Sequence, residues 1–191
     1  KLQTIKSKKI KKYWKQNIEI NPVFIDNKII FVSADLKIIA VNVDSGKIIW
    51  EIQSIDEPAR RGMVLSKENN NKYLFINIKN NLYKINIDNG ELEKKFGGKG
   101  HINTGGSLIA PVLFNNNIYI SSFDKVVGYN IETGEEFSKV SFHPPGRKFW
   151  GGIPWGGSAL DENYGILYLS TGNPRPALVG INRPGNNYNS N

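Results

Sequence analysis

A short segment recurs at a fixed interval along the chain, and this repeat limits the possible folds more than any other feature. Each copy is an alternating apolar run followed by an acidic residue, one polar residue and a glycine. The turn glycines are Gly46, Gly90 and Gly134, so both intervals are 44 residues. Alternating apolar residues indicate a half-buried strand, and glycine readily takes the positive φ that a three-residue hairpin loop needs.

Each copy therefore predicts a strand, a tight turn and a second strand. The turns are expected at residues 44–46, 88–90 and 132–134. The acidic residue of each turn can accept hydrogen bonds from backbone N–H groups, as Asp does in many turns.

Two further strands are predicted before each turn, for example within residues 22–32 and 111–120. Four short strands in 40–50 residues are typical of one propeller blade. The chain is predicted to be all-β: a β-propeller of four-stranded antiparallel blades, with three blades and an incomplete fourth from about residue 156. Because closed propellers need at least about four blades, we interpret residues 1–191 as part of a larger, truncated domain.

Composition excludes several classes of site. The chain has no cysteine, so disulfides, thiolate metal sites and thiol nucleophiles are excluded. The formal net charge is +8, and seven lysines fall within the first fifteen residues. We interpret residues 1–18 as a solvated basic lead-in and predict no nucleic-acid partner, since no zinc-finger spacing or RNA-binding motif accompanies the charge. A polyanion-binding surface is the alternative.

Three segments near the C-terminal end carry a family resemblance: residues 150–161, 166–176 and 183–190. They read WGGIPWGGSALD, ILYLSTGNPRP and RPGNNYNS. This order is similar to the Trp-Gly, Thr-Gly-Asn-Pro and Arg-Pro-Gly-Asp-Asn stretch of quinoprotein dehydrogenases, which oxidise alcohols and sugars with pyrroloquinoline quinone (PQQ). The resemblance extends over roughly residues 8–191 and implies an eight-bladed propeller.

The resemblance implies roles for two residues of these segments. Trp155 stands where the family places the floor on which the planar PQQ stacks, and a large rigid ring suits a flat cofactor. Asn173 stands where the family places an amide oxygen ligand of Ca²⁺, an ion that prefers oxygen donors. The structural alternatives are a tryptophan packed between blades and an asparagine that caps the turn before Pro174.

Three other positions are expected to contact the cofactor. Glu19 and Arg61 match residues near the PQQ carboxylates, with Arg60 as the alternative one position away. Ser121, or its neighbour Ser122, can hydrogen-bond the cofactor. The family's Gly-Ala-Glu loop, whose Glu binds Ca²⁺ in many members, is shortened here, and Asp124 is the candidate replacement.

The implied activity is hydride transfer from an alcohol or sugar carbon to PQQ, with Ca²⁺ as Lewis acid and an Asp as general base. That Asp is expected beyond Asn191, so no catalytic residue is assigned and the chain alone is expected to be inactive. The implied electron acceptor is a quinone or a cytochrome, and the implied location is the periplasm, with membrane association left open. The alternative is a PQQ-like propeller that binds proteins as a non-catalytic scaffold in the cell envelope.

Overall fold

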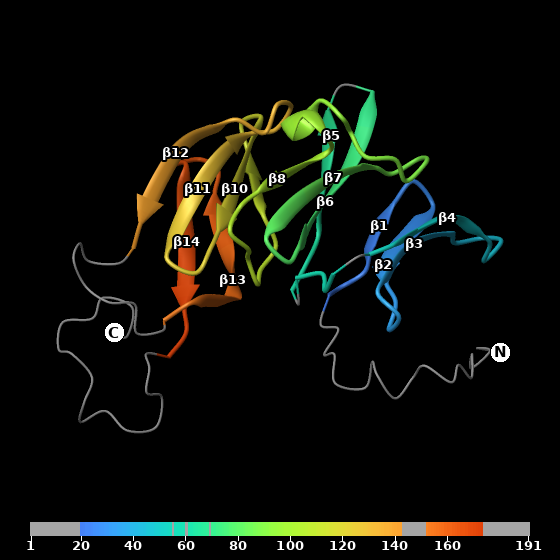
Figure 1. Cartoon of the computed structure of the whole chain (residues 1–191), viewed down its shortest axis with the longest axis horizontal. Helices are drawn as coiled ribbons and strands as arrows, with labels where there is room; N and C mark the ends of the chain where they lie inside the picture. The colour runs from blue at the N-terminus through green and yellow to red at the C-terminus, as the bar shows by residue number, and fades with distance from the viewer. Residues whose placement is uncertain (1–19, 55, 60, 69, 143–151, 174–191) are drawn as a thin grey trace.

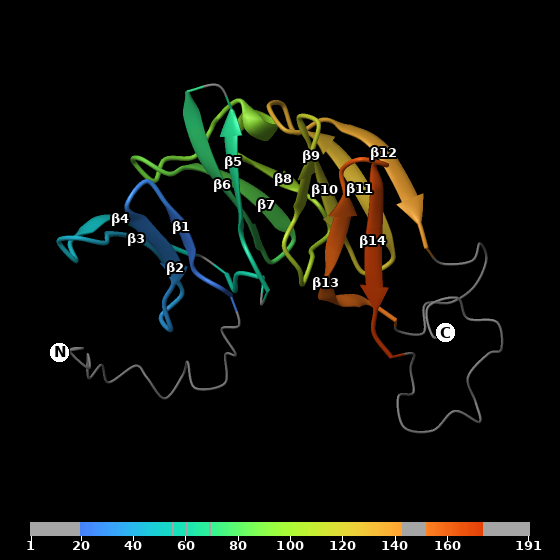
Figure 2. The same cartoon turned by 180° about the vertical axis from the view of Figure 1, so that it is seen from behind.

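The blades predicted from the repeat form three separate four-stranded antiparallel sheets, followed by a two-stranded one. The computed structural model describes residues 20–54, 56–59, 61–68, 70–142 and 152–173. Neighbouring strands in the sequence pair with each other in each sheet. Figures 1 and 2 show the sheets arranged side by side in an arc, which confirms the all-β propeller prediction.

The strand bounds are as follows. Blade 1 contains β1 (Val23–Ile25), β2 (Lys28–Val32), β3 (Lys37–Asn42) and β4 (Ile48–Gln53). Blade 2 contains β5 (Val64–Glu68), β6 (Asn71–Ile78), β7 (Asn81–Asn86) and β8 (His101–Asn103), with a short 3₁₀ helix, η1 (Phe96–Gly98), before β8. Blade 3 contains β9 (Val112–Phe114), β10 (Asn117–Ser121), β11 (Lys125–Asn130) and β12 (Glu136–Ser141). The fourth sheet contains β13 (Pro154–Asp161) and β14 (Ile166–Thr171).

No helix in the described part of the chain is long and apolar enough to cross a bilayer.

Strand β6 packs against both neighbouring blades. Leu74 and Ile76 belong to the core shared with blade 1, which also contains Ile30 and Ile38. Tyr73 and Phe75, on the opposite face, belong to the core shared with blade 3. Successive strand side chains point to opposite faces, so an apolar strand without alternation, such as β6, is buried on both sides. The blades are therefore held together by apolar surface that each sheet offers to both neighbours.

The turn glycines adopt the left-handed conformation, with φ of 65° at Gly46 and 77° at Gly90 and Gly134. The acidic residue, however, does not make the predicted hydrogen bonds to backbone N–H groups. Asn42, Asn86 and Asn130 make them instead: the side-chain oxygen of Asn42 accepts from the Ser45 N–H at 2.9 Å, and those of Asn86 and Asn130 accept from Asp88 and Glu132 at 2.8 and 2.9 Å. The prediction thus assigned these hydrogen bonds to the wrong residue of the repeat.

The acidic residues bind side chains of blade 1 in two of the three turns. Asp44 accepts a hydrogen bond from Asn27 within blade 1. Asp88 accepts one from Lys28 at 2.6 Å and so links blade 2 to blade 1. The position of Asn just before the turn explains its role, because its side-chain oxygen accepts from N–H groups two and three residues ahead.

Blade 2 differs from the prediction after its turn. A strand directly after Gly90 was expected, but only an isolated bridge between Ile85 and Leu92 forms there. The outer strand β8 begins at His101, and η1 lies between them. Phe96 of η1 is fully buried and packs edge-on against Phe75 at 5.5 Å between ring centroids. Because burial of this ring draws the chain inward, the outer strand begins later in the sequence than expected.

A tryptophan and a turn glycine connect blade 1 to blade 2. The Trp50 indole N–H donates to the Ile87 carbonyl at 2.8 Å. Gly90 lies against the face of the same indole, so close that a Cβ at this position would be 2.9 Å from the ring. At Gly46, the matching turn of blade 1, a Cβ would meet nothing within 4 Å.

This contrast predicts different effects of the same substitution in two matching turns. Gly46→Ala should cost about 1 kcal/mol of unfolding free energy, because only left-handed strain opposes it. Gly90→Ala should cost about 1–3 kcal/mol more, because the new methyl group also displaces Trp50. Urea unfolding followed by circular dichroism measures both, and equal losses would show that the Trp50 contact does not matter.

Candidate functional site

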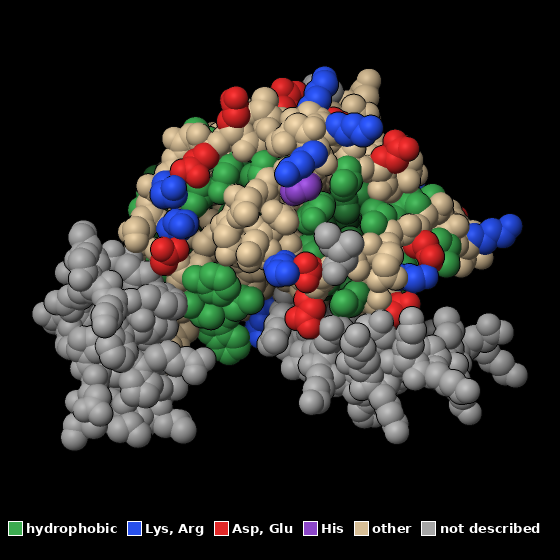
Figure 3. All heavy atoms as spheres, viewed as in Figure 1, with side chains coloured by type: hydrophobic (Ala, Val, Ile, Leu, Met, Phe, Trp, Pro, Cys, Tyr) green, Lys and Arg blue, Asp and Glu red, His purple; other side chains and the backbone are tan. Residues whose placement is uncertain are grey.

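Trp155 lies in a wide bulge at the start of the fourth sheet. Pro154 pairs with Thr171 and Ser158 pairs with Leu169, so three residues of β13 stand opposite one residue of β14. Gly157 in this bulge has a φ of 101°. The bulge breaks the usual alternation of side chains, and Trp155 is 51% exposed. Apolar side chains gather over the lower end of β13 in Figure 3.

Arg61 reaches Trp155 from blade 2. The guanidinium carbon lies 4.8 Å from the centroid of the indole ring, which is a cation–π contact. Gly62, the next residue, has a φ of 92°, and a Cβ there would be 2.6 Å from Cβ of Ala110. This close approach to blade 3 sets the path of the chain just before β5. Two predicted cofactor-binding residues, 94 positions apart in the sequence, are thus brought together.

Asn173 lies just after β14 and beside the Trp155 bulge. The N–H of Gly152 donates to the Asn173 carbonyl at 3.1 Å, and the N–H of Gly172 donates to the Ile153 carbonyl at 3.0 Å. The Asn173 side chain is exposed. Backbone hydrogen bonds between the segment before β13 and the segment after β14 therefore hold the candidate metal ligand near the candidate stacking residue.

The remaining predicted residues lie elsewhere. Ser121 ends β10 and is only 4% exposed, and its carbonyl accepts a hydrogen bond from the Ser107 hydroxyl at 2.8 Å. No described contact joins Ser121 to Arg61 or Trp155. Glu19 and the alternative Arg60 lie outside the described residues.

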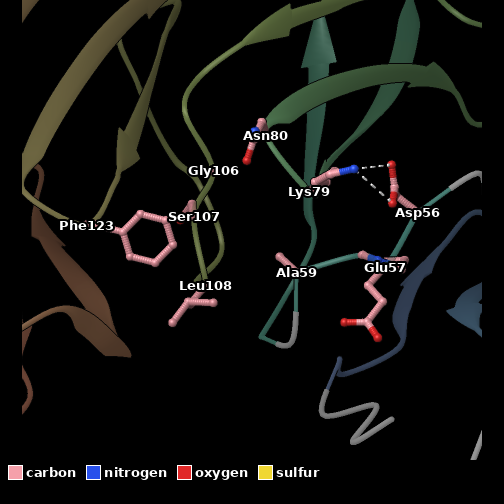
Figure 4. Close-up of a pocket in the computed structure, with 10 residues that line it drawn as sticks. Asp56, Glu57, Ala59, Lys79, Asn80, Gly106, Ser107, Leu108 and Phe123 are labelled. Atoms are coloured by element: carbon pink, nitrogen blue, oxygen red, sulfur yellow. Dashed lines mark hydrogen bonds and ion pairs between the residues drawn. The ribbon is translucent and has the colours of Figure 1, made fainter.

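A pocket of about 630 Å³ opens between blades 2 and 3. Phe123 and Leu108 face Ala59 and Glu57 across it (Figure 4). Ala59 lies two positions before Arg61, so the pocket borders the segment that carries the guanidinium. Lys79 and Asp56 form an ion pair at its edge, with 3.2 Å between Nζ and the carboxylate. The lining thus carries two carboxylates and one ammonium group, a charge balance that does not favour the anionic groups of PQQ.

The side chains that meet at Trp155 fit PQQ better than they fit a metal ion. A half-exposed indole and a guanidinium suit a flat, anionic ligand. Within the described ranges, no group of three or more His, Cys, Asp or Glu side chains is placed to hold a metal ion. The carboxylate of Asp124, the candidate replacement ligand, lies 3.7 Å from the ammonium nitrogen of Lys125. The candidate ligand Asn173 would offer one neutral oxygen donor, which alone is not a complete Ca²⁺ site.

Lys84 is a buried cation that the sequence analysis missed. It is 1% exposed, and its ammonium group donates to Glu68 at 2.6 Å and to the Ile131 carbonyl of blade 3 at 2.9 Å. The ammonium also lies 4.3 Å from the Tyr73 ring centroid. Burial and a hydrogen bond to Glu93 raise the pKa of Tyr73 to about 12. The repeat contains a signal for this residue. Ala40 and Gly128 occupy the positions equivalent to Lys84 in the other two copies, so only the second copy carries a charge there.

Loss of this ammonium should destabilise blade 2. Lys84→Met leaves the Glu68 carboxylate, 14% exposed, without its cation and should cost about 3–5 kcal/mol of unfolding free energy. Lys37→Met is the matched control, since its Glu51 partner is 45% exposed and solvent screens this pair, so the variant should lose far less stability than Lys84→Met. Equal losses in chemical denaturation would contradict a structural role for Lys84.

The pKa of His101 departs from the ordinary value of a histidine. Burial, and then the nearby Lys99, lower the pKa of His101 below 6.5, although a backbone hydrogen bond opposes them. Its ring stacks on Tyr83 at 4.8 Å, and Nδ1 is buried without a hydrogen-bond partner. The folded protein therefore favours the neutral ring.

The stability supplied by neutral His101 should be complete above pH 6.5 and should be lost as the pH falls through its lower folded-state pKa. His101→Phe keeps a ring against Tyr83 and removes the titration. The fall in unfolding free energy between pH 7 and pH 5 should be smaller in this variant. An unchanged pH profile in urea titrations would show that His101 does not contribute.

Four-stranded blades in an arc define a partial β-propeller, in which an arginine before blade 2 meets a tryptophan of the fourth sheet. Residues 1–140 match the family "PQQ: Glucose/ethanol/alcohol dehydrogenase, beta-propeller domain". The chain belongs to this family, as the resemblance implied. The matched range ends before Trp155 and Asn173.

Solved structures share the fold at low sequence identity. A quinohemoprotein alcohol dehydrogenase, ADHIIG, from Pseudomonas putida matches with a TM-score of 0.62 and 17% identity, over 82% of this chain and 28% of that one. A europium-containing methanol dehydrogenase matches with a TM-score of 0.59 and 14% identity, over 80% and 35%. BamB from Moraxella catarrhalis matches with a TM-score of 0.53 and 13% identity, over 77% and 41%.

The chain thus spans about a third of the length of the two dehydrogenases. Comparison with curated protein sequences gave no match.

Proposed function

We propose that this chain forms the PQQ-binding part of a dehydrogenase that oxidises alcohols or sugars, with Ca²⁺ as the associated metal ion. The observation that carries the proposal is the Arg61 guanidinium over the half-exposed indole of Trp155. A flat aromatic surface with an adjacent cationic fork matches a planar ligand that bears carboxylates. Family membership supports the same cofactor.

Bound PQQ would supply a two-electron acceptor, and Ca²⁺ would supply Lewis-acid polarisation of it. Trp155 contributes the stacking surface and holds the plane of the ligand. Arg61 pairs with a carboxylate, and Asn173 offers its amide oxygen to the metal ion. Ser121 and Glu19 stay proposed contacts of the cofactor.

Arg61 must leave the indole face when a ligand stacks there. The cation–π contact is worth about 0.5–2 kcal/mol, whereas a charge-assisted hydrogen bond to a carboxylate is worth about 1.5–3 kcal/mol. The exchange therefore favours an anionic planar ligand over a neutral one. This selectivity follows from the present position of the guanidinium.

No general base is assigned among the described residues, so we expect these 191 residues alone to bind the cofactor without turnover. The proposed electron acceptor is a quinone or a cytochrome, and the proposed location is the periplasm. A non-catalytic scaffold in the cell envelope is the competing function, and cofactor binding separates the two.

The test measures PQQ affinity by titration calorimetry on the full-length gene product freed of PQQ. Arg61→Met should weaken binding about tenfold or more, because one charge-assisted hydrogen bond is lost. Lys79→Met is the matched control: it removes a cation beside the pocket but not over the indole, and it should change the affinity by less than about threefold.

Dye reduction over a panel of alcohols and aldoses, with added PQQ and Ca²⁺, then identifies the substrate class. Turnover that requires PQQ and falls in Trp155→Ala and Asn173→Ala is the expected result. Absence of both PQQ binding and turnover would reject the enzyme and favour the scaffold.

A further inference from the structure

We propose that Gly172 is a positioning residue that sets the plane of the Trp155 indole. A Cβ at position 172 would lie 2.5 Å from Nε1 and 2.7 Å from Cδ1 of Trp155. Real Cβ atoms do not approach other atoms this closely, so any side chain at this position must displace the ring. The inference deepens the proposed function, on which it rests, because it identifies what holds the stacking surface in place.

Space, and not backbone conformation, requires the glycine at this position. Gly172 is not among the residues with positive φ, so alanine can adopt its backbone conformation. The obstacle to a side chain is the edge of the indole, and the next nearest atom is the Ile153 carbonyl oxygen at 3.3 Å. The contact between position 172 and Trp155 is therefore specific.

The backbone around Gly172 has little freedom to move away from the ring. Its N–H donates to Ile153 at 3.0 Å, and the Gly152 N–H donates to Asn173 at 3.1 Å. Retreat of residue 172 would stretch both hydrogen bonds and would also move Asn173. The ring would therefore rotate or shift, and one methyl group would disturb the stacking surface.

Displacement of the indole also changes its contact with Arg61, whose guanidinium lies 4.8 Å from the ring centroid. Gly172 thus influences both proposed PQQ-binding groups while touching only one of them. A shift of about 1 Å in a positioned group can cost about a hundredfold in catalytic rate, and stacking on the indole depends on the same kind of positioning. A loss of about tenfold or more in PQQ affinity is expected for Gly172→Ala.

Gly156→Ala is the matched control in the same sheet. A Cβ at position 156 would meet only the Ser170 hydroxyl, at 2.9 Å, and this side chain can rotate away at the cost of its exposed hydrogen bond to the Gly157 carbonyl at 3.3 Å. Gly156 also has no positive φ. This variant should keep PQQ affinity within about threefold, since it leaves the indole in place.

The experiment measures PQQ affinity by titration calorimetry in the full-length gene product for Gly172→Ala, Gly156→Ala, Trp155→Ala and the double variant Gly172→Ala/Trp155→Ala. If Gly172 acts through the indole, the double variant binds no more weakly than Trp155→Ala alone. Equal affinity of Gly172→Ala and Gly156→Ala, or additive losses in the double variant, would overturn the inference. If Gly172→Ala does not fold, folding of the double variant would support the inference, and its failure to fold would overturn it.

A second measurement needs no cofactor and separates this inference from the proposed function. The emission of Trp155, taken as the difference between each protein and its Trp155→Ala counterpart, should change in wavelength or in acrylamide quenching in Gly172→Ala but not in Gly156→Ala. If the unsubstituted protein does not bind PQQ, the proposed function fails and the emission alone decides the role of Gly172. An unchanged emission rejects the positioning role, whatever the cofactor.

Discussion

Packing between blades is the interaction on which the rest of this structure depends. Strand β6 has buried side chains on both faces, and these belong to two different cores. A single four-stranded sheet of this kind leaves apolar surface exposed, so each blade needs a neighbour on each side. Hydrogen bonds from Trp50 to Ile87 and from Lys84 to Ile131 add specific links at the two interfaces. The arc in Figure 1 is the result of these contacts repeated along the chain.

The candidate site depends on this arc, because its residues come from different blades. Arg61 precedes β5 of blade 2, and Trp155 lies in the β13 bulge of the fourth sheet. Glycine allows the close approaches that bring them together, at position 62 against Ala110 and at position 172 against the indole. A bulge at position 155 would be a defect in an isolated hairpin, but here it turns an aromatic side chain out of the sheet.

Much of the fold could be predicted from the repeat, because a 44-residue period with turn glycines is a local pattern. The predicted strands before each turn are present in the structure, and so are the glycines with positive φ. Errors arose where a side chain acts through a contact that the pattern does not contain. Asn86, and not Asp88, caps its turn, and buried Phe96 delays the outer strand of blade 2.

The amino-acid sequence by itself determined the blade pattern, the family and the residue types of the candidate site, since strand periodicity and turn chemistry act over a few neighbouring residues. Only the tertiary structure decided that Arg61 lies over Trp155, that Ser121 is buried, that Lys84 is enclosed between blades and that Gly172 touches the indole. The contacts of Gly172 with Trp155, of Lys84 with Ile131 and of Arg61 with Trp155 join residues 17, 47 and 94 positions apart. Their distances are set by how the sheets pack, and packing is a property of the whole arc.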